Sequence, residues 1–562
     1  MTNRSLWCCA VAVALVTFGC DGGSGTDAGS PPIDSGETPM DAGGGGMDAG
    51  GPPPVDCTAP AGDDIWTPPD DLPAFGPAER GRIVRCGATD PVDAATADAR
   101  ARMPFNREAG SPGTYDGPTL THGADRTFVL YRSERRNGEG GLSSGVLYLP
   151  SSGETNLPLI VHVSGTTGLA DACAPSRGRF SDLERTLYVL IGSGHAVFVP
   201  DLIGLGTPGT LAYLEAAEAA HATLDGARAA LAAAPAGRLS GQVLISGHSA
   251  GGHAALVAQA LQRTYAPELN LIGVSALAGV WFDTAVFGEL MTVPSYSTGG
   301  DNGWNVVYGA MYFVGHTAAY DGEARAYDPI HPERRTAVRD AFQSYCLVPA
   351  VEGGMDLRQA IAATASNVSE LFDPGFWMPF SSRIWCDAGI EERCPELVAR
   401  WIERFAADRP PLDPEGAPIW FHQGELDSRS TVDSMRCPIA EAVYRGVDAN
   451  VCYYTGVEHG PIAGTAAPWL VSWASALAAG SAAPPCLDDA AWPTVSPAAC
   501  GLAPPMDGGV PPSDAGTPTD AGTPTDAGTP MDAGVDAGAS DAGDTDAGDP
   551  DAGDTDAGDD AG

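Results

Sequence analysis

Residues Gly247 to Gly251 read Gly-His-Ser-Ala-Gly, a G-x-S-x-G pattern set between an apolar run and a helical pattern. Residues 242–246 are apolar and partly β-branched, which predicts a buried strand. Residues 252–263 carry apolar side chains at helical spacing. A serine between two such elements lies on a tight turn, where the flanking glycines relieve crowding and leave the hydroxyl exposed. Ser249 is therefore the candidate nucleophile of a strand–turn–helix unit.

The string alone is weak evidence, because a second copy occurs at residues 141–145. Gly fills 72 of the 562 positions, so a chance match is expected in a chain of this length. The second copy lies between strand-like runs at 127–133 and 146–149, and no helical pattern follows it. This context predicts a hairpin, and Ser143 is not expected to act as a nucleophile.

A serine nucleophile needs a general base, and the base needs an orienting carboxylate. Two predicted strands, 418–423 and 450–454, are each followed by a turn that holds a suitable side chain. Asp427 follows the first and His459 follows the second.

A helical pattern at 434–445 separates these two strands, and another at 467–479 closes the region. The sequence thus predicts a triad of Ser249, Asp427 and His459. Glu425 and Asp433 remain as rival acids.

Acyl transfer also needs hydrogen-bond donors for the developing oxyanion. The backbone N–H of Ala250, next to the nucleophile, is one candidate. A strand at 159–163 runs into the glycine-containing loop 164–168, which lets the backbone approach a substrate. We expect the second donor to be Gly165 or Thr166.

Alternating strand and helix patterns from 127 to 278 indicate a parallel α/β sheet with helices on both faces. Several further motifs lie within residues 114–479: Ser144–Pro150, Ser164–Gly168 with Cys173–Ser176, Gly194–Val197 with Pro200–Gly206, and Leu224–Ala229. Through these motifs and those around Ser249, Asp427 and His459, the chain resembles the secretory lipase group of the α/β-hydrolases. The family's oxyanion loop reads H-G-T-T-G…C-A-P-S, and this chain has Ser164 in place of the His. It implies an α/β-hydrolase fold that cleaves carboxylic esters, including lipids, through an acyl-enzyme and without a cofactor.

About 140 residues of different character lie between the predicted strands 271–277 and 418–423. This stretch is rich in aromatic and Met side chains: Trp281, Phe282, Trp304, Tyr308, Met311, Tyr312, Phe313, Phe376, Trp377 and Met378. We expect residues 281–412 to form a helical cap over the active site. Its aromatic residues either bind an acyl chain or form the core of the cap.

The chain begins with a signal-peptide pattern over residues 1–20 that ends in Gly19-Cys20. This ending is similar to a bacterial lipobox, which predicts lipidation of Cys20, anchoring to a membrane of the cell envelope and export. Ordinary signal cleavage and secretion is the alternative. The folded hydrolase domain is expected at 57–500.

The formal net charge of −42 is concentrated at the two ends. Residues 21–56 hold seven acids and no base, and residues 501–562 hold 15 acids and no base, with the tripeptide Asp-Ala-Gly repeated throughout. Such sequence cannot bury enough apolar area to offset chain entropy, so we predict a disordered linker and a disordered tail. The acidity argues against nucleic acid as a partner. No protein partner is evident.

Ten of the 13 cysteines lie beyond Cys20, an even number that suits disulfides in an oxidising compartment. Local spacing suggests the pairs Cys57–Cys86, Cys386–Cys394, Cys437–Cys452 and Cys486–Cys500, which leaves Cys173 with Cys346. No paired C-x-x-C spacing is present, so we expect no metal site.

We expect four further histidines and two aspartates to have structural roles. His162 and His195 are expected to be buried and hydrogen-bonded, and His248 and His253 to lie near the site without chemistry. Asp201 and Asp225 should fix loop and helix geometry. An α/β-hydrolase peptidase and a non-catalytic surface binding protein on the same fold remain the alternative functions.

Overall fold

The computed structural model describes residues 56–62, 65–103, 114–178, 184–281, 290–293, 295–300, 303–349, 354–387, 389–488 and 490–502. The predictions for the signal peptide with Cys20, for nearly all of the linker and tail, and for Phe282 lie outside these residues. Within them, no helix is long and apolar enough to cross a membrane.

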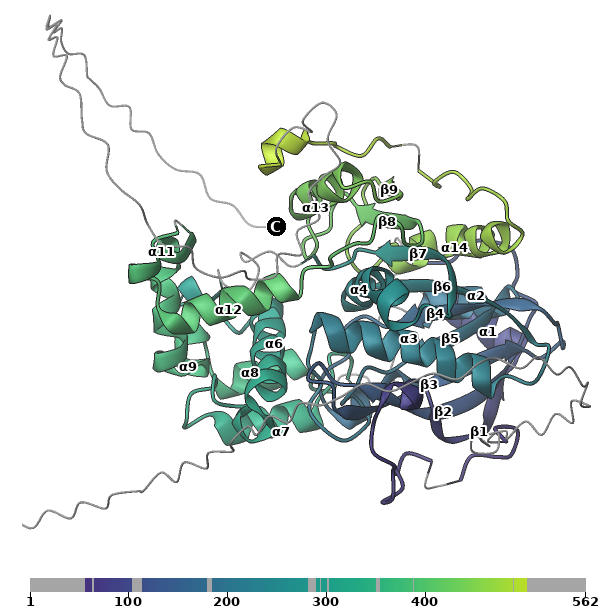
Figure 1. Ribbon diagram of the computed structural model, residues 1–562, viewed down its shortest axis with the longest axis horizontal. Helices are drawn as coiled ribbons and strands as arrows, with labels where there is room; N and C mark the ends of the chain where they lie inside the picture. The colour runs from purple at the N-terminus through teal and green to yellow at the C-terminus, as the bar shows by residue number, and fades with distance from the viewer. Residues whose placement is uncertain are drawn as a thin grey trace, which may run out of the picture.

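The core is a mixed sheet of nine strands in the order β1-β2-β3-β5-β4-β6-β7-β8-β9 (Figure 1). The first three pairings of this order are antiparallel, and the remaining five are parallel. The strands are β1 Ile83–Val92, β2 Ala124–Glu134, β3 Gly140–Pro150, β4 Leu157–Val163, β5 Ala196–Pro200, β6 Leu239–His248, β7 Asn270–Leu277, β8 Ile419–Gly424 and β9 Ala449–Tyr454. The predicted mostly parallel α/β fold is confirmed.

Helices cover both faces of this sheet, and the strand residues alternate between the two layers. Along β2, Val129 packs in the layer with α3 (Ala216–Ala233), α4 (Ala250–Tyr265) and α13 (Val432–Tyr444). Its neighbour Phe128 packs in the opposite layer, with α1 (Ala94–Ala101), α2 (Glu184–Gly192) and α14 (Ile462–Ala478). This two-residue alternation is what a sheet buried on both faces requires.

The copy of the serine pattern at 141–145 lies inside β3, in the hairpin that β2 and β3 form. The predicted hairpin is therefore present, but its turn precedes the pattern. Ser143 is fully buried, and its Oγ donates to the backbone oxygen of Asp201 at 2.5 Å. A buried strand residue of this kind has no access to substrate.

Helices fill the insertion between β7 and β8: α6 Gly303–Asp321, α7 Arg335–Ser344, α8 Leu357–Thr364, α9 Val368–Leu371, α10 Pro374–Trp377, α11 Arg383–Asp387 and α12 Glu396–Ala407. They lie to the left of the sheet in Figure 1. Their aromatic residues build an apolar cluster in which Phe313 meets Trp401, with ring centroids 4.9 Å apart, and which also includes Leu211 and Tyr213 of the sheet domain. Most of the predicted aromatic stretch therefore packs against itself.

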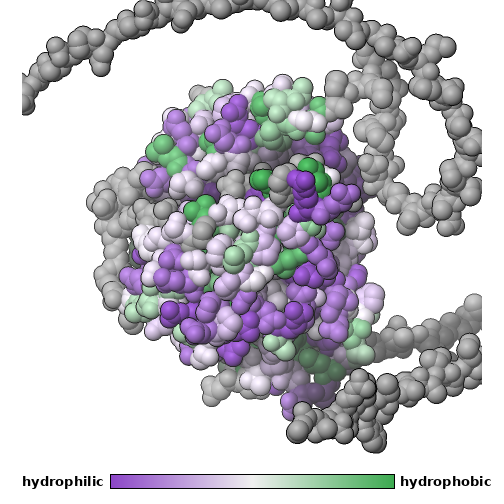
Figure 2. Space-filling view, turned by 90° about the vertical axis from the view of Figure 1, so that its left-hand side faces the viewer, coloured by the Kyte–Doolittle hydropathy of each residue, from purple (hydrophilic) through white to green (hydrophobic). Residues whose placement is uncertain are grey.

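The outer face of this insertion is mixed in polarity. Figure 2 shows hydrophobic side chains as separate patches among hydrophilic ones. Exposed large apolar side chains of the insertion are Val293, Val348, Met355, Met378, Ile384 and Ile390. On the face in view the hydrophobic patches do not merge into one continuous apolar surface.

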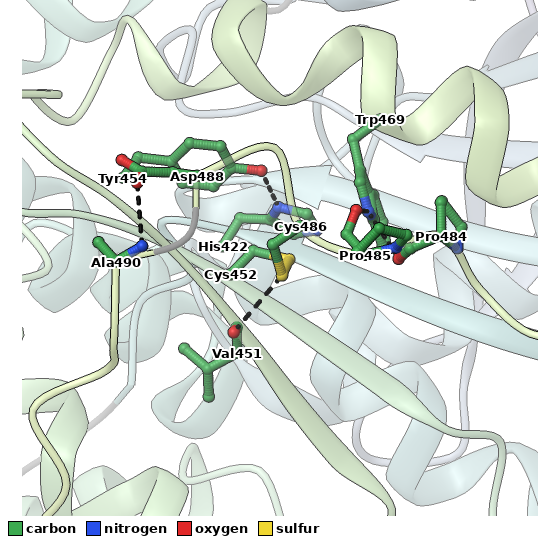
Figure 3. Close-up of a disulfide and its surroundings, with 10 residues drawn as sticks. All are labelled: His422, Val451, Cys452, Tyr454, Trp469, Pro484, Pro485, Cys486, Asp488 and Ala490. Carbon is green, nitrogen blue, oxygen red and sulfur yellow. Dashed lines mark hydrogen bonds between the residues drawn. A yellow bond between two sulfur atoms is a disulfide. The ribbon is translucent and has the colours of Figure 1, made fainter.

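Five disulfides link the described residues, and three of them match the predicted pairs: Cys57–Cys86, Cys173–Cys346 and Cys386–Cys394. The predicted pairs Cys437–Cys452 and Cys486–Cys500 are wrong, because the bonds are Cys437–Cys500 and Cys452–Cys486. After α14 the chain returns along β9, where Cys486 meets Cys452 (Figure 3). It then reaches α13, which carries Cys437. Spacing along the chain could not reveal this return.

Candidate active site

Ser249 lies at the junction of β6 and α4, where it is the N-cap residue of the helix. Its backbone angles, φ 56° and ψ −117°, fall in a region that non-glycine residues seldom adopt. The neighbouring glycines permit this turn. A Cβ on Gly251 would lie 2.1 Å from the backbone oxygen of Val163, and one on Gly247 would lie 2.1 Å from that of Gly251. The motif glycines are therefore required by close backbone packing.

Three side chains from different strand ends meet at this turn. The Nε2 atom of His459 lies 2.9 Å from the Oγ of Ser249, and its Nδ1 lies 2.9 Å from Oδ2 of Asp427. Because an ionised carboxylate only accepts hydrogen bonds, Nδ1 carries the proton and Nε2 is left to accept from the serine hydroxyl. Ser249 and His459 are half-buried, whereas the carboxylate of Asp427 is fully buried.

The surrounding backbone fixes the carboxylate of Asp427. Its Oδ1 accepts hydrogen bonds from the backbone N–H groups of Arg429 and Ser430, each at 2.8 Å. The loop that carries His459 is held nearby, because the N–H of Leu426 donates to the backbone oxygen of Val457 at 2.9 Å. These backbone donors were not foreseen from the sequence, since nothing in the residue types marks them.

The two rival acids lie elsewhere. The carboxylate of Glu425 accepts from the backbone N–H of Gly456 at 2.8 Å and is exposed. Asp433 has an 88% exposed side chain and forms an ion pair with Arg436 at 3.3 Å. The structure therefore brings only Asp427 of these three acids to His459.

The predicted oxyanion donors border one small apolar cavity. Ala250 is the first residue of α4, and the first backbone N–H groups of a helix have no partner within it. Ala250, Gly165 and Thr166 line this cavity together with Leu205, Leu211 and Tyr213. The hydroxyl groups of Thr166 and Tyr213 lie 2.7 Å apart. Sequence reasoning missed Tyr213, which no motif of the serine pattern indicates.

The loop that holds Gly165 and Thr166 is braced from two sides. From the insertion, the N–H of Leu347 donates to the backbone oxygen of Thr167 at 2.8 Å, and Cys346 is bonded to Cys173. From the core, the carboxylate of Asp201 accepts from the backbone N–H of Ser176 at 3.0 Å.

The positions of Asp201 and Asp225 agree with the structural roles that we predicted for them. Burial raises the pKa of Asp201 to about 6, and its hydrogen bonds to Ser144 and Ser176 oppose that rise. Asp225 on α3 accepts from the hydroxyls of Ser133 and Tyr265 and pairs with Arg228 at 2.6 Å. Neither carboxylate contacts the triad.

The histidines of the core are buried. Burial lowers the pKa of His162, His248 and His422 to about 3 and that of His195 to about 4, so all four are neutral near pH 7. His195 lies 3.3 Å from the hydroxyl of Ser475, as expected. The expectation of a hydrogen-bonded His162 is wrong, because neither of its ring nitrogens has a partner among the described residues.

His248 and His253 both make backbone contacts. The Nε2 of His253 lies 2.8 Å from the backbone oxygen of Asp408. The Nε2 of His248 lies 2.8 Å from the backbone oxygen of His459 itself. Among the described residues, no cluster of three or more His, Cys, Asp or Glu side chains is arranged to hold a metal ion.

The family model of the secretory lipases matches residues 182–289, a segment that contains Ser249 and its turn. Over this segment the chain is similar to the secretory lipases. The resemblance predicted from the sequence is thereby confirmed for residues 182–289.

Solved structures share the fold of this chain. Candida antarctica lipase A superposes with a TM-score of 0.52 at 16% identity, covering 78% of this chain and 91% of that one. The rice cell wall degrading esterase LipA from Xanthomonas oryzae gives 0.51 at 18% identity, covering 71% and 97%. A protein from Legionella pneumophila gives 0.55 at 16%, covering 70% and 98%. No curated protein matches the chain in sequence.

Proposed function

We propose that the protein is an exported serine hydrolase that cleaves carboxylic esters through an acyl-enzyme on Ser249. The observation that carries this proposal is the continuous chain of contacts from Ser249 through His459 to Asp427, with both contacts of the imidazole at 2.9 Å. This is the geometry that a nucleophile, a general base and an orienting acid need.

In this mechanism Ser249 Oγ attacks the acyl carbon while His459 Nε2 takes the hydroxyl proton. The carbonyl oxygen becomes an oxyanion, which accepts hydrogen bonds from the backbone N–H of Ala250 and of Gly165 or Thr166. The proton on His459 then passes to the leaving alkoxide, and the alcohol departs. Water, deprotonated by His459, attacks the acyl-enzyme and releases the carboxylic acid.

Asp427 keeps its role throughout both half-reactions. It holds the His459 ring in the tautomer with the proton on Nδ1, and its charge stabilises the imidazolium that forms. The two backbone N–H groups on Oδ1 keep the carboxylate oriented toward the ring. Because the acid is fully buried, water does not screen this interaction.

The helical insertion, predicted as a cap over 281–412, is proposed to form one wall of this site. Two contacts support this role. The backbone of Leu347 bonds to Thr167 in the oxyanion loop, and the guanidinium of Arg429, two residues after Asp427, donates to the Oδ1 of Asn305 on α6 at 3.0 Å.

Ser249→Ala tests the proposal against the matched control Ser143→Ala, which alters the second copy of the same motif. Removing the nucleophile should lower kcat/KM on a soluble chromogenic ester by about 10⁴-fold or more without loss of folding. The control should keep full activity per folded molecule, although it loses a buried hydrogen bond. Equal activity of both variants would contradict the proposal.

A substrate panel separates this function from the alternatives. Esters of increasing acyl length should be turned over and aminoacyl amides should not. Preference for the amides would indicate a peptidase, and no turnover of either class would indicate a binding protein.

Export and anchoring through lipidated Cys20 are also proposals, supported by the signal-peptide pattern and by the five disulfides. Cys20→Ser should abolish acylation and release the protein from the membrane fraction, while activity on a soluble ester persists. Recovery of unlipidated mature wild-type protein would support ordinary cleavage instead.

A further inference from the structure

We propose that His248 is a positioning residue for catalysis: its imidazole N–H holds the backbone oxygen of His459 and thereby sets the approach of the His459 ring to Ser249. This inference rests on the proposed function. It assigns a role to the variable second position of the G-x-S-x-G motif, next to the nucleophile.

The first observation is a direct contact between the serine turn and the histidine loop. The Nε2 of His248 lies 2.8 Å from the backbone oxygen of His459, and the two ring centroids are 5.0 Å apart. A carbonyl oxygen only accepts hydrogen bonds, so Nε2 must carry the proton. Residues 248 and 249 therefore contact the backbone and the side chain of His459 respectively, which fixes the catalytic histidine at two points.

The second observation is that the other nitrogen of the His248 ring makes no hydrogen bond with the described residues. The Nδ1 atom of His248 is buried and has no hydrogen-bond partner among the described residues. A buried polar atom left without a partner is costly, and a hydrophobic side chain would avoid that cost. The hydrogen bond from Nε2 to the loop of His459 therefore accounts for the presence of a histidine at this buried position.

The third observation concerns charge. Four groups meet here: His248 on β6, His162 on β4, and His459 and Asp427 on the loops after β9 and β8. Burial, reinforced by the neighbouring His459, lowers the pKa of His248 to about 3. The donor is consequently neutral when His459 becomes protonated during the reaction, and it adds no second positive charge beside the imidazolium.

The remainder of the histidine loop shows why a second anchor is needed. The start of the loop is fixed at Val457, whose backbone oxygen accepts from Leu426. A Cβ on Gly424 would lie 2.3 Å from that oxygen, so strand and loop are in close contact there. Residue 459 itself lies beyond this contact, and the bond from His248 supplies the restraint at that position.

The test compares His248→Phe, which removes the donor, with His248→Gln, which keeps an N–H donor on a side chain of similar reach. His422→Phe is the matched control, because His422 is also a buried neutral histidine on a sheet strand, and its Nδ1 contacts the hydroxyl of Tyr454 rather than the triad. Each variant is assayed for kcat and KM on a soluble ester from pH 5 to 9, alongside its thermal midpoint.

We expect His248→Phe to lower kcat by about 10²-fold with little change in KM and to shift the acidic limb of the pH profile. His248→Gln should recover at least tenfold of that loss, and His422→Phe should change stability alone. Full kcat in folded His248→Phe overturns the inference, as does failure of the Gln variant to exceed the Phe variant.

A second measurement keeps the inference falsifiable if the variants do not fold or the wild type lacks esterase activity. Wild-type protein with ¹⁵N-labelled histidine should show His248 as a neutral Nε2–H tautomer that does not titrate between pH 5 and 8. An Nδ1–H tautomer, or titration near pH 6, overturns the inference. Inactive wild type with the expected tautomer would instead count against the proposed hydrolase function.

Discussion

The sheet core and the helical insertion differ in how they are built and in what they provide to the site. In the core, parallel strands end at one edge, and Ser249, Asp427 and His459 each follow such an end. The insertion instead gathers its helices around aromatic side chains such as Phe313 and Trp401. The core therefore arranges chemistry through its topology, whereas the insertion is organised around an aromatic cluster that also contacts core residues such as Tyr213.

The junction between the two regions contains apolar contacts, such as Tyr213 with Tyr308, and also buried polar groups. Asp408, just after α12, accepts from the backbone N–H of Ala216 on α3 at 3.1 Å and from the Nε2 of His316 on α6 at 2.8 Å. The hydroxyl of Tyr312 also donates to it. Burial and the nearby Asp408 raise the pKa of Glu215 to about 7. The insertion is thus attached by groups that need specific partners, which fixes its placement on the core.

The largest expected effect is the loss of turnover in Asp427→Asn, which tests whether the core positions the catalytic groups. Asp427→Asn should lower turnover by about 10⁴-fold, because an amide favours the wrong imidazole tautomer and cannot stabilise imidazolium. Glu425→Gln and Asp433→Asn, measured as kcat/KM under identical conditions, should each cost less than about tenfold. Were Glu425→Gln the most damaging of the three, the acid assignment would move to Glu425.

The second prediction tests whether the insertion supports the oxyanion loop. The double variant Cys173→Ala/Cys346→Ala should lower the free energy of unfolding by roughly 2–5 kcal/mol, since this disulfide closes a long loop. It should also reduce kcat, because the loop of Gly165 and Thr166 loses its covalent brace. Cys386→Ala/Cys394→Ala is the matched control, with a bond that joins residues only eight apart within the insertion. Equal kcat in the two double variants would separate the insertion from the catalytic step.

The third prediction concerns the junction. Asp408→Asn keeps an acceptor for Ala216 but removes the buried charge that His316 and Tyr312 contact. Chemical denaturation should show a loss of about 1–3 kcal/mol. Thermal melting followed separately by insertion and core tryptophans would reveal whether the regions then unfold in two steps. Coincident transitions with unchanged stability would contradict this account of the junction.

The smallest expected effect is on the pH dependence of the free energy of unfolding, which we expect to arise from buried histidines of the core. The lowered pKa values of His162, His195, His248 and His422 belong to the core. Below about pH 6.5 the unfolded chain binds protons at these histidines, while the folded chain does not until about pH 3 to 4, so stability falls as the pH falls. His422→Gln should therefore flatten the slope of unfolding free energy between pH 4 and 6 by about 1.4 kcal/mol per pH unit.

The slope of the variant must be compared with that of the wild type, because other buried groups also make stability depend on pH. Asp201 and Asp225 have pKa values raised to about 6, and they act in the opposite direction because the folded state binds their protons first. Their contributions cancel in the difference. An unchanged slope in His422→Gln would mean that His422 titrates in the folded protein.

The sequence predicts the structure of the core better than that of the insertion. In the core, each strand and helix has its own local pattern, so β6, β8 and β9 were located from residues alone, within a few positions. The order of Ser249, Asp427 and His459 then placed them together. The choice between Asp427 and Glu425 depends on which way a turn directs its side chains, and residue types do not determine that.

The remaining discrepancies come from contacts between distant segments. The return of the chain past β9 decided the pairing of Cys452 with Cys486, and spacing favoured Cys437 instead. His162 was expected to find a partner, but its position between buried strands provides none among the described residues. In the insertion, aromatic content predicted a core but not the seven helices from α6 to α12, whose order depends on packing with one another.

The disulfides nearest the two ends of the described chain have a mechanical consequence. Cys57 is bonded to Cys86 on β1, and Cys500 is bonded to Cys437 on α13. A pulling force applied to the chain before residue 57 or after residue 500 would therefore pass through a covalent bond directly to β1 or to α13. It could not peel the terminal segments away one hydrogen bond at a time. His459 lies between Cys437 and Cys500, so a load applied after residue 500 would bypass the loop that carries it.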